Sequence, residues 1–490
     1  MDIKIGKFIL ETLTTGMYDS PKDIYREYIQ NSVDSIDNAV NKGVLKSCNA
    51  YITIKIDKEN KNISIVDNGT GISCTKAQEY LLNIGDSVKF NTNNRGFRGI
   101  GRLAGLAYCD ELVFSTSFYG EEVKTIIKFN AIELRKRLYE IDNNDSLEKV
   151  FTSIVSINKE YETKSKHYFS VMMSGVTNTD DILNDKKVYN YLSQVAPVPF
   201  APNFKWKEII KSKLTYRGLN LSEYNIVLEG DTYKETIYKN YQDYFLADRV
   251  RKTEDKIEDV EEKVFEDDEG KPLAILWWAK TNYSGTVQNE RAKCIRLRKG
   301  NIQLGTKNTL NSIFKDERFN GWLIGELHII SPELIPNARR DNIENTSVFY
   351  CLRVQLEKWA DEVSSIIKKI SIIRCSEKTN KKIENTIVTA STLGEPLNNI
   401  DIIPEIEINY KEEYDDVAHS ELINQLDILI SNKNSCTKYK ALNIQTGLTI
   451  EEKKILEKVL DIIKEKQGDK ADNIISTIIK EYKNKCLSKY

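Results

Sequence analysis

Hydrophobic and polar positions follow two different periods along the first 130 residues. Between residues 23 and 42, apolar side chains recur every three or four positions, at Ile24, Tyr28, Val33, Ile36 and Val40. This spacing predicts a helix with one apolar face, for which Ser20 is a suitable N-cap, Pro21 a suitable first-turn residue and Gly43 a suitable end. Alternation with a period of two follows, and it predicts four strands, at residues 51–57, 62–67, 111–118 and 123–130.

The pattern is less regular beyond residue 130. Residues 130–190 are polar and predict mainly helix without clear bounds, and the proline-rich segment 195–204 predicts a connector between two domains. The acidic run at 254–269 predicts a solvated loop or an exposed helix. Strand-like segments indicate a second domain that mixes helix and sheet, and they lie at residues 213–221, 224–230, 273–280, 294–300 and 321–330.

The last third of the chain predicts helices. An amphipathic pattern runs from Ser347 to about Arg374, and similar patterns return near the C-terminus. The whole pattern predicts an α+β protein in five parts. These are an N-terminal domain at 1–190, a second domain at 191–346, a long helix at 347–374, a linker at 375–415 and a helical C-terminal region at 416–490.

Composition narrows the possible environments of the protein. The 490 residues are 40% hydrophobic and 29% charged with a net charge of -2, so the chain as a whole gives no electrostatic reason to bind nucleic acid or an anionic membrane. No apolar stretch approaches the roughly 18–20 residues of a membrane span, and the N-terminus lacks the features of a signal peptide. The eight cysteines include no CxxC pair, which argues against a zinc site or a disulfide framework. We therefore expect a cytoplasmic protein.

Three motifs in the first 105 residues carry candidate chemistry. The first is Glu27-x-x-x-Asn31-x-x-Asp34, whose three side chains share one face of the predicted helix. An amide oxygen beside carboxylates suits a hydrated magnesium ion, and a carboxylate one turn away can orient or deprotonate a water molecule. A solvated helix face produces the same pattern, so this motif alone is weak.

The second motif directly follows a predicted strand and reads Asp67-Asn68-Gly69-Thr70-Gly71. A carboxylate at the end of a strand can accept a hydrogen bond from an exocyclic amine, and glycines let the backbone approach a flat ring. A simple glycine turn is the alternative interpretation.

The third motif is a glycine-rich run made of Gly96, Phe97, Arg98, Gly99, Ile100 and Gly101. Backbone amides in such a loop, leading into a helix, can cradle phosphate. A flexible loop or a fragment of a dinucleotide-binding fingerprint would look similar. The fingerprint belongs directly after the first strand of a βαβ unit, however, and here the run comes after a helix and two strands.

Taken in this order and spacing, the three motifs resemble the N, G1 and G2 boxes of the GHKL superfamily of ATPases. Its members include gyrase B subunits, the ninety-kilodalton heat-shock chaperones, histidine kinases and MutL-type repair proteins. The resemblance implies a Bergerat-type ATP-binding α/β sandwich with ATP and Mg²⁺ as ligands. It makes Glu27 the general base, Asn31 the magnesium ligand and Asp67 the residue that reads the adenine amine.

The same resemblance assigns further residues around the nucleotide. Asp34 would support the site beside the nucleotide, and Asn83 would lie near the phosphates or the ribose. The glycines at 69 and 71 belong to the adenine-side box. The run from Gly96 to Gly101 would form a lid over the triphosphate.

The second domain carries a segment that resembles the catalytic loop of the chaperone's middle domain. It reads LIPNARRD from Leu334 to Asp341, and its Asn337, Arg340 and Asp341 match the loop's asparagine, phosphate-binding arginine and acidic residue. Arg339 stands where the chaperone has serine, so both arginines remain candidates, and a surface pair bound to neighbouring acids is the alternative. Lys299 resembles the loop lysine of the ribosomal S5-like transducer domains of MutL and gyrase, and we rank it below Arg340.

The resemblance also implies a homodimer that closes through its N-terminal domains when ATP binds, with residues 1–20 as a segment for exchange between protomers. No histidine precedes the first motif, which argues against a histidine kinase, and neither a topoisomerase cleavage domain nor a nuclease metal motif is visible. Three uses remain open. They are a chaperone-like conformational machine acting on a protein client, a nucleic-acid clamp similar to the Morc and MutL ATPases, and an ATPase switch subunit of a bacterial stress or phage-defence system with a separate effector.

Overall fold

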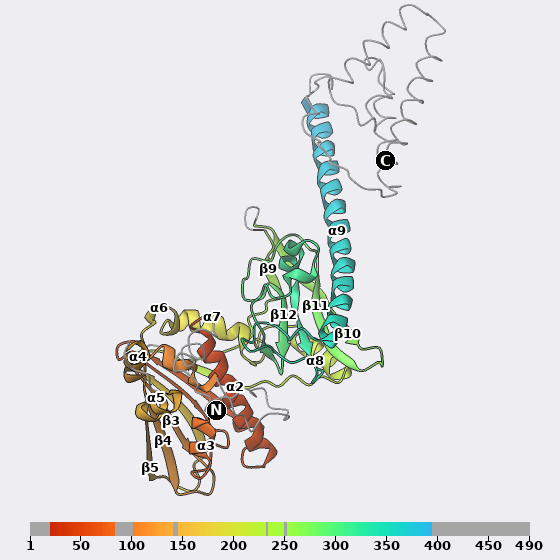
Figure 1. The fold of residues 1–490 in the computed structure, drawn as a ribbon. Coiled ribbons are helices and arrows are strands. Elements are labelled where there is room, and N and C mark those ends of the chain that lie inside the picture. The colour runs from red at the N-terminus through yellow and green to blue at the C-terminus, as the bar shows by residue number, and fades with distance from the viewer. Residues whose placement is uncertain (1–19, 84–100, 141–145, 232–233, 249–251, 394–490) are drawn as a thin grey trace, which may run out of the picture. The chain divides into compact units, whose positions relative to one another are not determined.

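The computed structural model describes residues 20–83, 101–140, 146–231, 234–248 and 252–393, which contain two sheets (Figure 1). The α-helices are α2 (Asp23–Asn41), α3 (Ala77–Leu82), α4 (Ala131–Tyr139), α5 (Leu147–Ile154), α6 (Thr179–Ile182), α7 (Asp185–Val195), α8 (Lys207–Tyr216) and α9 (Ser347–Leu393). Short 3₁₀-helices are η1 (Ser47–Asn49), η2 (Gly101–Ala107), η3 (Asn311–Ile313) and η4 (Glu317–Trp322).

The first sheet has eight strands in the order β5-β4-β3-β6-β2-β1-β7-β8. Neighbouring strands pair antiparallel, except that β1 and β7 pair parallel, so the sheet is mixed. The strands are β1 (Tyr51–Asp57), β2 (Asn62–Asp67), β3 (Glu111–Ser117), β4 (Val123–Asn130), β5 (Val155–Tyr161), β6 (Tyr168–Ser174), β7 (Asn225–Glu229) and β8 (Lys234–Thr236).

One face of this sheet packs against α2. In β2 the buried positions are every second residue, Ile63, Ile65 and Asp67, and the two isoleucines share a core with the apolar face of α2. The antiparallel register places Ile65 opposite Ile54 and Asp67 opposite Ile52. Asp67 therefore occupies a position that the alternation reserves for an apolar side chain, and its carboxylate lies beneath the helix.

The second sheet has six strands in the order β13-β12-β14-β11-β10-β9. Strands β12 and β14 are parallel and the other pairs are antiparallel. The strands are β9 (Tyr244–Leu246), β10 (Glu254–Glu266), β11 (Pro272–Thr281), β12 (Cys294–Lys299), β13 (Ile302–Gln303) and β14 (Ile324–Ile329).

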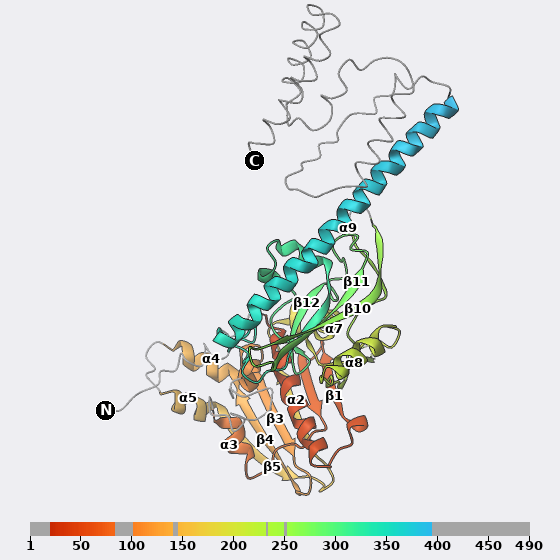
Figure 2. The same cartoon turned by 90° about the vertical axis from the view of Figure 1, so that its right-hand side faces the viewer.

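Both faces of the second sheet are covered, which the central strand β11 shows directly. Its residues Ala274, Leu276 and Trp278 share a core with α9, which crosses this face in Figure 2. The alternate residues Ile275, Trp277 and Ala279 pack instead with α8 and with Phe200 and Phe204 of the connector. The continuous apolar run of β11 is therefore the signature of a strand buried on both sides.

Most of the predicted elements of the N-terminal part are confirmed. The strands at 51–57, 62–67 and 123–130 have the predicted bounds, and the strand at 111–118 ends one residue earlier, at Ser117. Gly43 follows α2 with a positive φ of 70°, as a helix-ending glycine does. Ser20 is not the N-cap, however, because Lys22 holds that position, and the Ser20 hydroxyl accepts a hydrogen bond from the Lys22 amide in the preceding turn.

Other predictions were incomplete or wrong. The stretch 130–190 has more helix than strand where it is described, as predicted, but it also contains β5 and β6, which the prediction missed, and β6 lies between β3 and β2 in the middle of the first sheet. The segment 213–221 is the end of α8 and a turn rather than a strand. Strand β7 does form at 225–229, but it pairs with β1 and so belongs to the first sheet, beyond the boundary predicted at residue 190.

Two predictions about charged or polar segments also fail. The acidic run forms β10, in which Ile257, Val260 and Phe265 are buried while most of the carboxylates point outward. Helix α9 begins at Ser347 as predicted but continues to Leu393, so residues 375–393 are helix rather than linker. Residues 394–490 and the segment 1–19 lie outside the described residues. Within the described ranges, no helix is both long and apolar enough to cross a membrane.

Candidate functional site

Helix α2 presents the three residues of the first motif toward the first domain's interior. Glu27 and Asp34 are buried, and Asn31, between them on the same face, is half-buried. Ionisable side chains in such positions carry a desolvation cost that an ordinary solvated helix face does not. The structure therefore argues against the solvated-face interpretation of this motif.

Asp67 ends β2 fully buried, with its two carboxylate oxygens in different situations. Oδ1 accepts a hydrogen bond of 2.9 Å from the amide of Gly69, whereas the buried Oδ2 has no hydrogen-bond partner of good geometry among the described residues. Burial raises the pKa of this carboxyl from 3.8 to about 7, against the opposing effect of the Gly69 amide and the nearby hydroxyls of Ser32 and Ser35. A buried oxygen without a donor is what a hydrogen-bonding ligand group would satisfy.

The glycines after Asp67 let the chain pass very close to its neighbours. A Cβ on Gly69 would lie 2.6 Å from the carbonyl carbon of Ser35 on α2, and Gly71 has a φ of +64° with the Ser117 carbonyl 1.9 Å from where its Cβ would be. The Thr70 amide donates to the Ser35 carbonyl at 3.2 Å. These glycines are therefore needed for packing of the loop against α2 and β3, whatever they do for a ligand.

The glycine-rich run lies mostly outside the described residues. Gly96, Phe97, Arg98, Gly99 and Ile100 are not described, so the predicted lid stays a prediction. Gly101 begins η2 beside the first motif, since a Cβ there would lie 2.1 Å from Oε2 of Glu27. Asn83 is exposed at the end of α3, and its carbonyl accepts a hydrogen bond from the Arg102 guanidinium.

The segment that resembles the chaperone's catalytic loop approaches α2. Nη1 of Arg340 lies 3.4 Å from Oε2 of Glu27, although 313 residues separate them. Arg340 adopts a φ of +57°, a conformation that is strained for a residue with a side chain. Asn337 supports the turn, because its side-chain oxygen accepts the Asp341 amide at 3.1 Å and its backbone carbonyl accepts the Arg340 amide.

Arg339 and Lys299, the other two candidates, are placed differently. The side chain of Arg339 is exposed, and its carbonyl accepts a hydrogen bond from Nη2 of Arg26 at 3.2 Å. Nζ of Lys299 donates to the carbonyls of Ser331 and Leu334, at the start of the same loop. Burial lowers the pKa of Lys299 to about 8. Of the three candidates, Arg340 is the one whose side chain the structure brings to Glu27.

Sequence reasoning missed several residues around the first motif. Arg26 lies 3.8 Å from Glu27 and joins α2 to the loop carbonyl of Arg339. The Tyr28 hydroxyl accepts from the Gly105 amide and donates to the Arg102 carbonyl, which ties η2 to α2. His167 donates through Nδ1 to the Gly69 carbonyl at 2.7 Å. Arg26 and Tyr28 are buried and His167 is half-buried. None of them carries a spacing signal in the sequence, so only their tertiary partners identify them.

Magnesium would have few protein ligands at this site. No group of three or more His, Cys, Asp and Glu side chains with metal-binding geometry occurs in the part of the chain that the structure describes. Mg²⁺ keeps most of its waters and takes substrate phosphate oxygens, so one amide oxygen such as that of Asn31 fits its chemistry.

Comparison with known proteins agrees with this geometry. The family model described as "Histidine kinase-, DNA gyrase B-, and HSP90-like ATPase" matches residues 20–160. Residues 20–160 belong to the GHKL superfamily. The eight-stranded mixed sheet, with α2 on its core face, is consistent with a GHKL ATPase domain.

Curated relatives of the GHKL domain are chaperones. The chain is 33% identical over 92 residues to Chaperone protein HtpG of Acinetobacter baylyi, which covers 18% of this chain and 14% of that protein. It is 27% identical over 190 residues to Chaperone protein HtpG of Rickettsia rickettsii, covering 34% of this chain and 29% of that protein. The chain thus spans less than a third of the length of these relatives.

The raised pKa of Asp67 predicts that the free energy of unfolding of the nucleotide-free protein decreases with rising pH. The pKa of the Asp67 carboxyl is about 7 in the folded protein, and its ordinary value is 3.8. Burial of this carboxyl therefore does not reduce the free energy of unfolding below about pH 4, and reduces it progressively as the pH rises to 7. Asp67→Asn removes this titration. Between pH 5 and pH 8, we expect the free energy of unfolding of the wild type to fall by about 2–3 kcal/mol relative to Asp67→Asn. Urea denaturation followed by circular dichroism measures this difference, and parallel pH profiles would contradict the assignment.

Proposed function

We propose that this protein binds ATP with Mg²⁺, hydrolyses it to ADP and phosphate, and uses the cycle to change the arrangement of its domains. The single observation that carries the proposal is the contact between Arg340 and Glu27, at 3.4 Å. It brings a cation of the second domain to the carboxylate that the GHKL fold uses in hydrolysis. Such a contact is expected of a site that both domains complete.

ATP binding is supported by the unsatisfied carboxylate oxygen of Asp67. Leaving a buried acceptor unpaired costs about 1–3 kcal/mol, and a ligand amine that donates to Oδ2 would recover that cost. The exocyclic amine of adenine is a donor of this kind. Gly69 follows the carboxylate closely along the chain, and neither it nor Gly71 places a side chain against α2 or β3.

Hydrolysis is supported by the placement of Glu27. Its carboxylate is buried, in reach of two guanidinium groups, and one turn of helix before Asn31. We assign it to orient and deprotonate the attacking water. Magnesium bound through Asn31 would neutralise negative charge on the phosphate oxygens. Arg340 would then leave Glu27 to stabilise the negative charge that develops on the transferred phosphoryl group.

The biological use that fits these features is a chaperone-like conformational machine. Arg340 can serve the reaction only when the second domain is held against α2, so turnover depends on the arrangement of the two domains. We further propose that the protein forms a homodimer through its N-terminal domains when ATP binds, as the GHKL resemblance implies. A protein client follows from the chaperone relatives, whereas the net charge of -2 gives no support to a nucleic-acid clamp.

Two substitutions separate binding from chemistry. In Glu27→Ala, we expect phosphate release to fall by about 10²-fold or more with ATP affinity retained, because a general base is removed. In Asp67→Asn, we expect ATP affinity to fall about 10- to 100-fold, because the acceptor for the adenine amine becomes an amide. Steady-state phosphate release and titration calorimetry with magnesium measure the two effects. Normal hydrolysis by Glu27→Ala would show that the assignment is wrong.

The two neighbouring arginines provide a matched comparison. Arg340→Ala removes the guanidinium beside Glu27, and we expect kcat to fall about 10²-fold with little change in ATP affinity. Arg339→Ala leaves the backbone carbonyl that binds Arg26 in place, and we expect kcat to change by less than about threefold. Both are measured by phosphate release at saturating ATP. The reverse order of effects would transfer the role to Arg339.

A further inference from the structure

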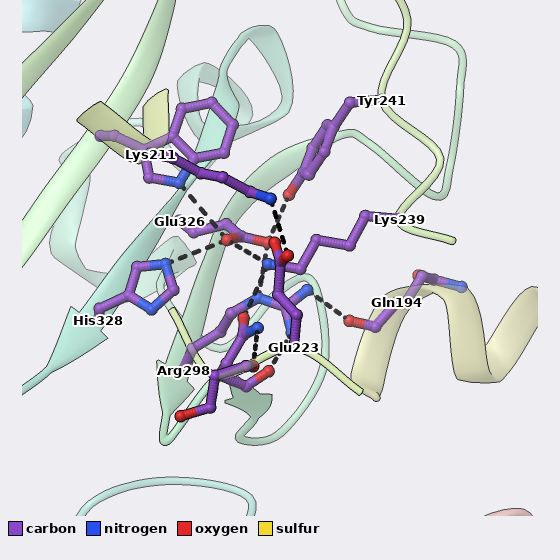
Figure 3. Close-up of polar contacts among 11 residues, drawn as sticks. Gln194, Lys211, Glu223, Lys239, Tyr241, Arg298, Glu326 and His328 are labelled. Carbon is purple, nitrogen blue, oxygen red and sulfur yellow. Dashed lines mark hydrogen bonds and ion pairs between the residues drawn. The ribbon is translucent and has the colours of Figure 1, made fainter. Parts of the chain in front are cut away.

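Strands β12 and β14 carry a row of polar side chains on the face that α9 does not cover. Ile295 and Leu297 of β12 and Leu327 of β14 pack toward α9. The alternate residues of the two strands point to the other face and are at most 2% exposed. They are Arg296, Arg298, Glu326 and His328. Figure 3 shows the cluster that forms around Glu326. Charged groups this deeply buried are retained only with partners.

The Glu326 carboxylate is the centre of this cluster. Oε1 binds Nε of Arg298 at 2.6 Å and accepts the Tyr241 hydroxyl at 3.0 Å. Oε2 accepts two hydrogen bonds, from Nζ of Lys239 at 2.8 Å and from Nε2 of His328 at 3.0 Å. Burial by itself would raise the pKa of Glu326, but the charges of Arg298 and Lys239 hold it well below its ordinary value. Glu326 is therefore a fixed anion that anchors Arg298.

Arg298 extends from this anchor to the first domain's helices. Its Nη1 donates to the carbonyl of Asn301 at 2.9 Å, and its Nη2 donates to the carbonyl of Gln194 at 2.7 Å. Gln194 lies in the last turn of α7, which ends at Val195. The last carbonyls of a helix lack partners within it and carry partial negative charge, so a guanidinium there is favourable. Arg298 thus caps α7 from the second sheet.

Helix α7 in turn holds the start of α2. The Tyr191 hydroxyl donates to Oδ1 of Asp23 at 2.7 Å, and Tyr191 lies one turn before the carbonyl that Arg298 binds. Val188 and Leu192 of α7 lie in the same core as the apolar face of α2. Asp23 and Glu27 are one helical turn apart and share a face. The first turn of α2, and with it Glu27, is therefore tied to α7.

We propose that Arg298 is a positioning residue for hydrolysis: it joins the Glu326 cluster of the second sheet to α7 and, through Tyr191 and Asp23, sets the position of Glu27. This rests on the proposed ATPase function. The contact differs from that of Arg340, which meets Glu27 directly. Arg298 touches neither the nucleotide site nor Glu27 and acts through the helix between them.

Arg296 offers a matched control on the same strand. It lies two residues before Arg298, faces the same side and is equally buried, at 1% exposed. Its Nη2 donates to the carbonyl of Glu290, in the segment between β11 and β12, and not to α7. Substitution of either arginine by lysine keeps the charge but loses the fork that binds several acceptors at once. Of the two substitutions, only Arg298→Lys removes a hydrogen bond to α7, while the bond from Arg291 to Asn190 of α7 remains in both.

The experiment combines amide hydrogen exchange of the nucleotide-free protein with steady-state hydrolysis. In Arg298→Lys, we expect faster exchange in α7 and in the first two turns of α2. We also expect kcat to be lower by roughly two- to thirtyfold, the range of couplings carried by such contact networks, with KM for ATP within about twofold of wild type. In Arg296→Lys, exchange in α2 and kcat should stay at wild-type values.

Tyr191→Phe tests the second half of the link even where Arg298→Lys does not fold. It removes only the hydroxyl that binds Asp23, and it should also speed exchange in α2 and lower kcat, with an effect that does not add to that of Arg298→Lys. Unchanged α2 exchange in Tyr191→Phe and Arg298→Lys, or equal effects of Arg296→Lys and Arg298→Lys, would overturn the proposal. If the wild type hydrolyses no ATP, the proposed ATPase function is wrong. If α2 nevertheless exchanges faster in Arg298→Lys than in the wild type, the structural link between Arg298 and α2 is still supported.

Discussion

The close approach between α2 and the chain leaving β2 is the constraint on which the candidate site depends. Gly69 passes so near to Ser35 that no side chain fits between them, and the Thr70 amide binds the Ser35 carbonyl. This contact closes the helix over Asp67, which already sits in the apolar alternation of β2. A carboxylate is thus buried with one oxygen unsatisfied, and the pKa of about 7 follows from that burial.

The two acidic groups of the site therefore differ by environment rather than by type. Asp67 has no cationic partner among the described residues and accepts a hydrogen bond from an amide, an environment that suits the proposed recognition of a neutral amine. Glu27 instead forms ion pairs with Arg26 and Arg340, at 3.8 and 3.4 Å. The cation that completes the second environment comes from a loop far along the chain. The hydrolysis proposed at Glu27 would thereby depend on the placement of the second domain.

The sequence predicted the parts whose pattern is local. Strands β1 and β2 show their alternation directly, and the motif on α2 needs only helical spacing. The acidic strand β10 was missed because its outward carboxylates outnumber the buried Ile257, Val260 and Phe265 and so suggested a solvated segment. The contact of Arg298 with α7 was not predictable either. The alternation of β12 indicates a half-exposed strand, and only the tertiary structure shows that its polar face is buried against the end of α7.

The most direct test of the account compares the affinities of ATP and inosine triphosphate for the wild-type protein at pH 8 with magnesium. Inosine triphosphate carries a carbonyl in place of the adenine amine and is otherwise nearly the same size. Above the Asp67 pKa of about 7 the carboxylate accepts hydrogen bonds but does not donate them. We expect ATP to bind about 10- to 100-fold more tightly, because the inosine carbonyl leaves the buried Oδ2 of Asp67 unpaired. Equal affinities would contradict the central claim that this carboxylate reads the adenine base.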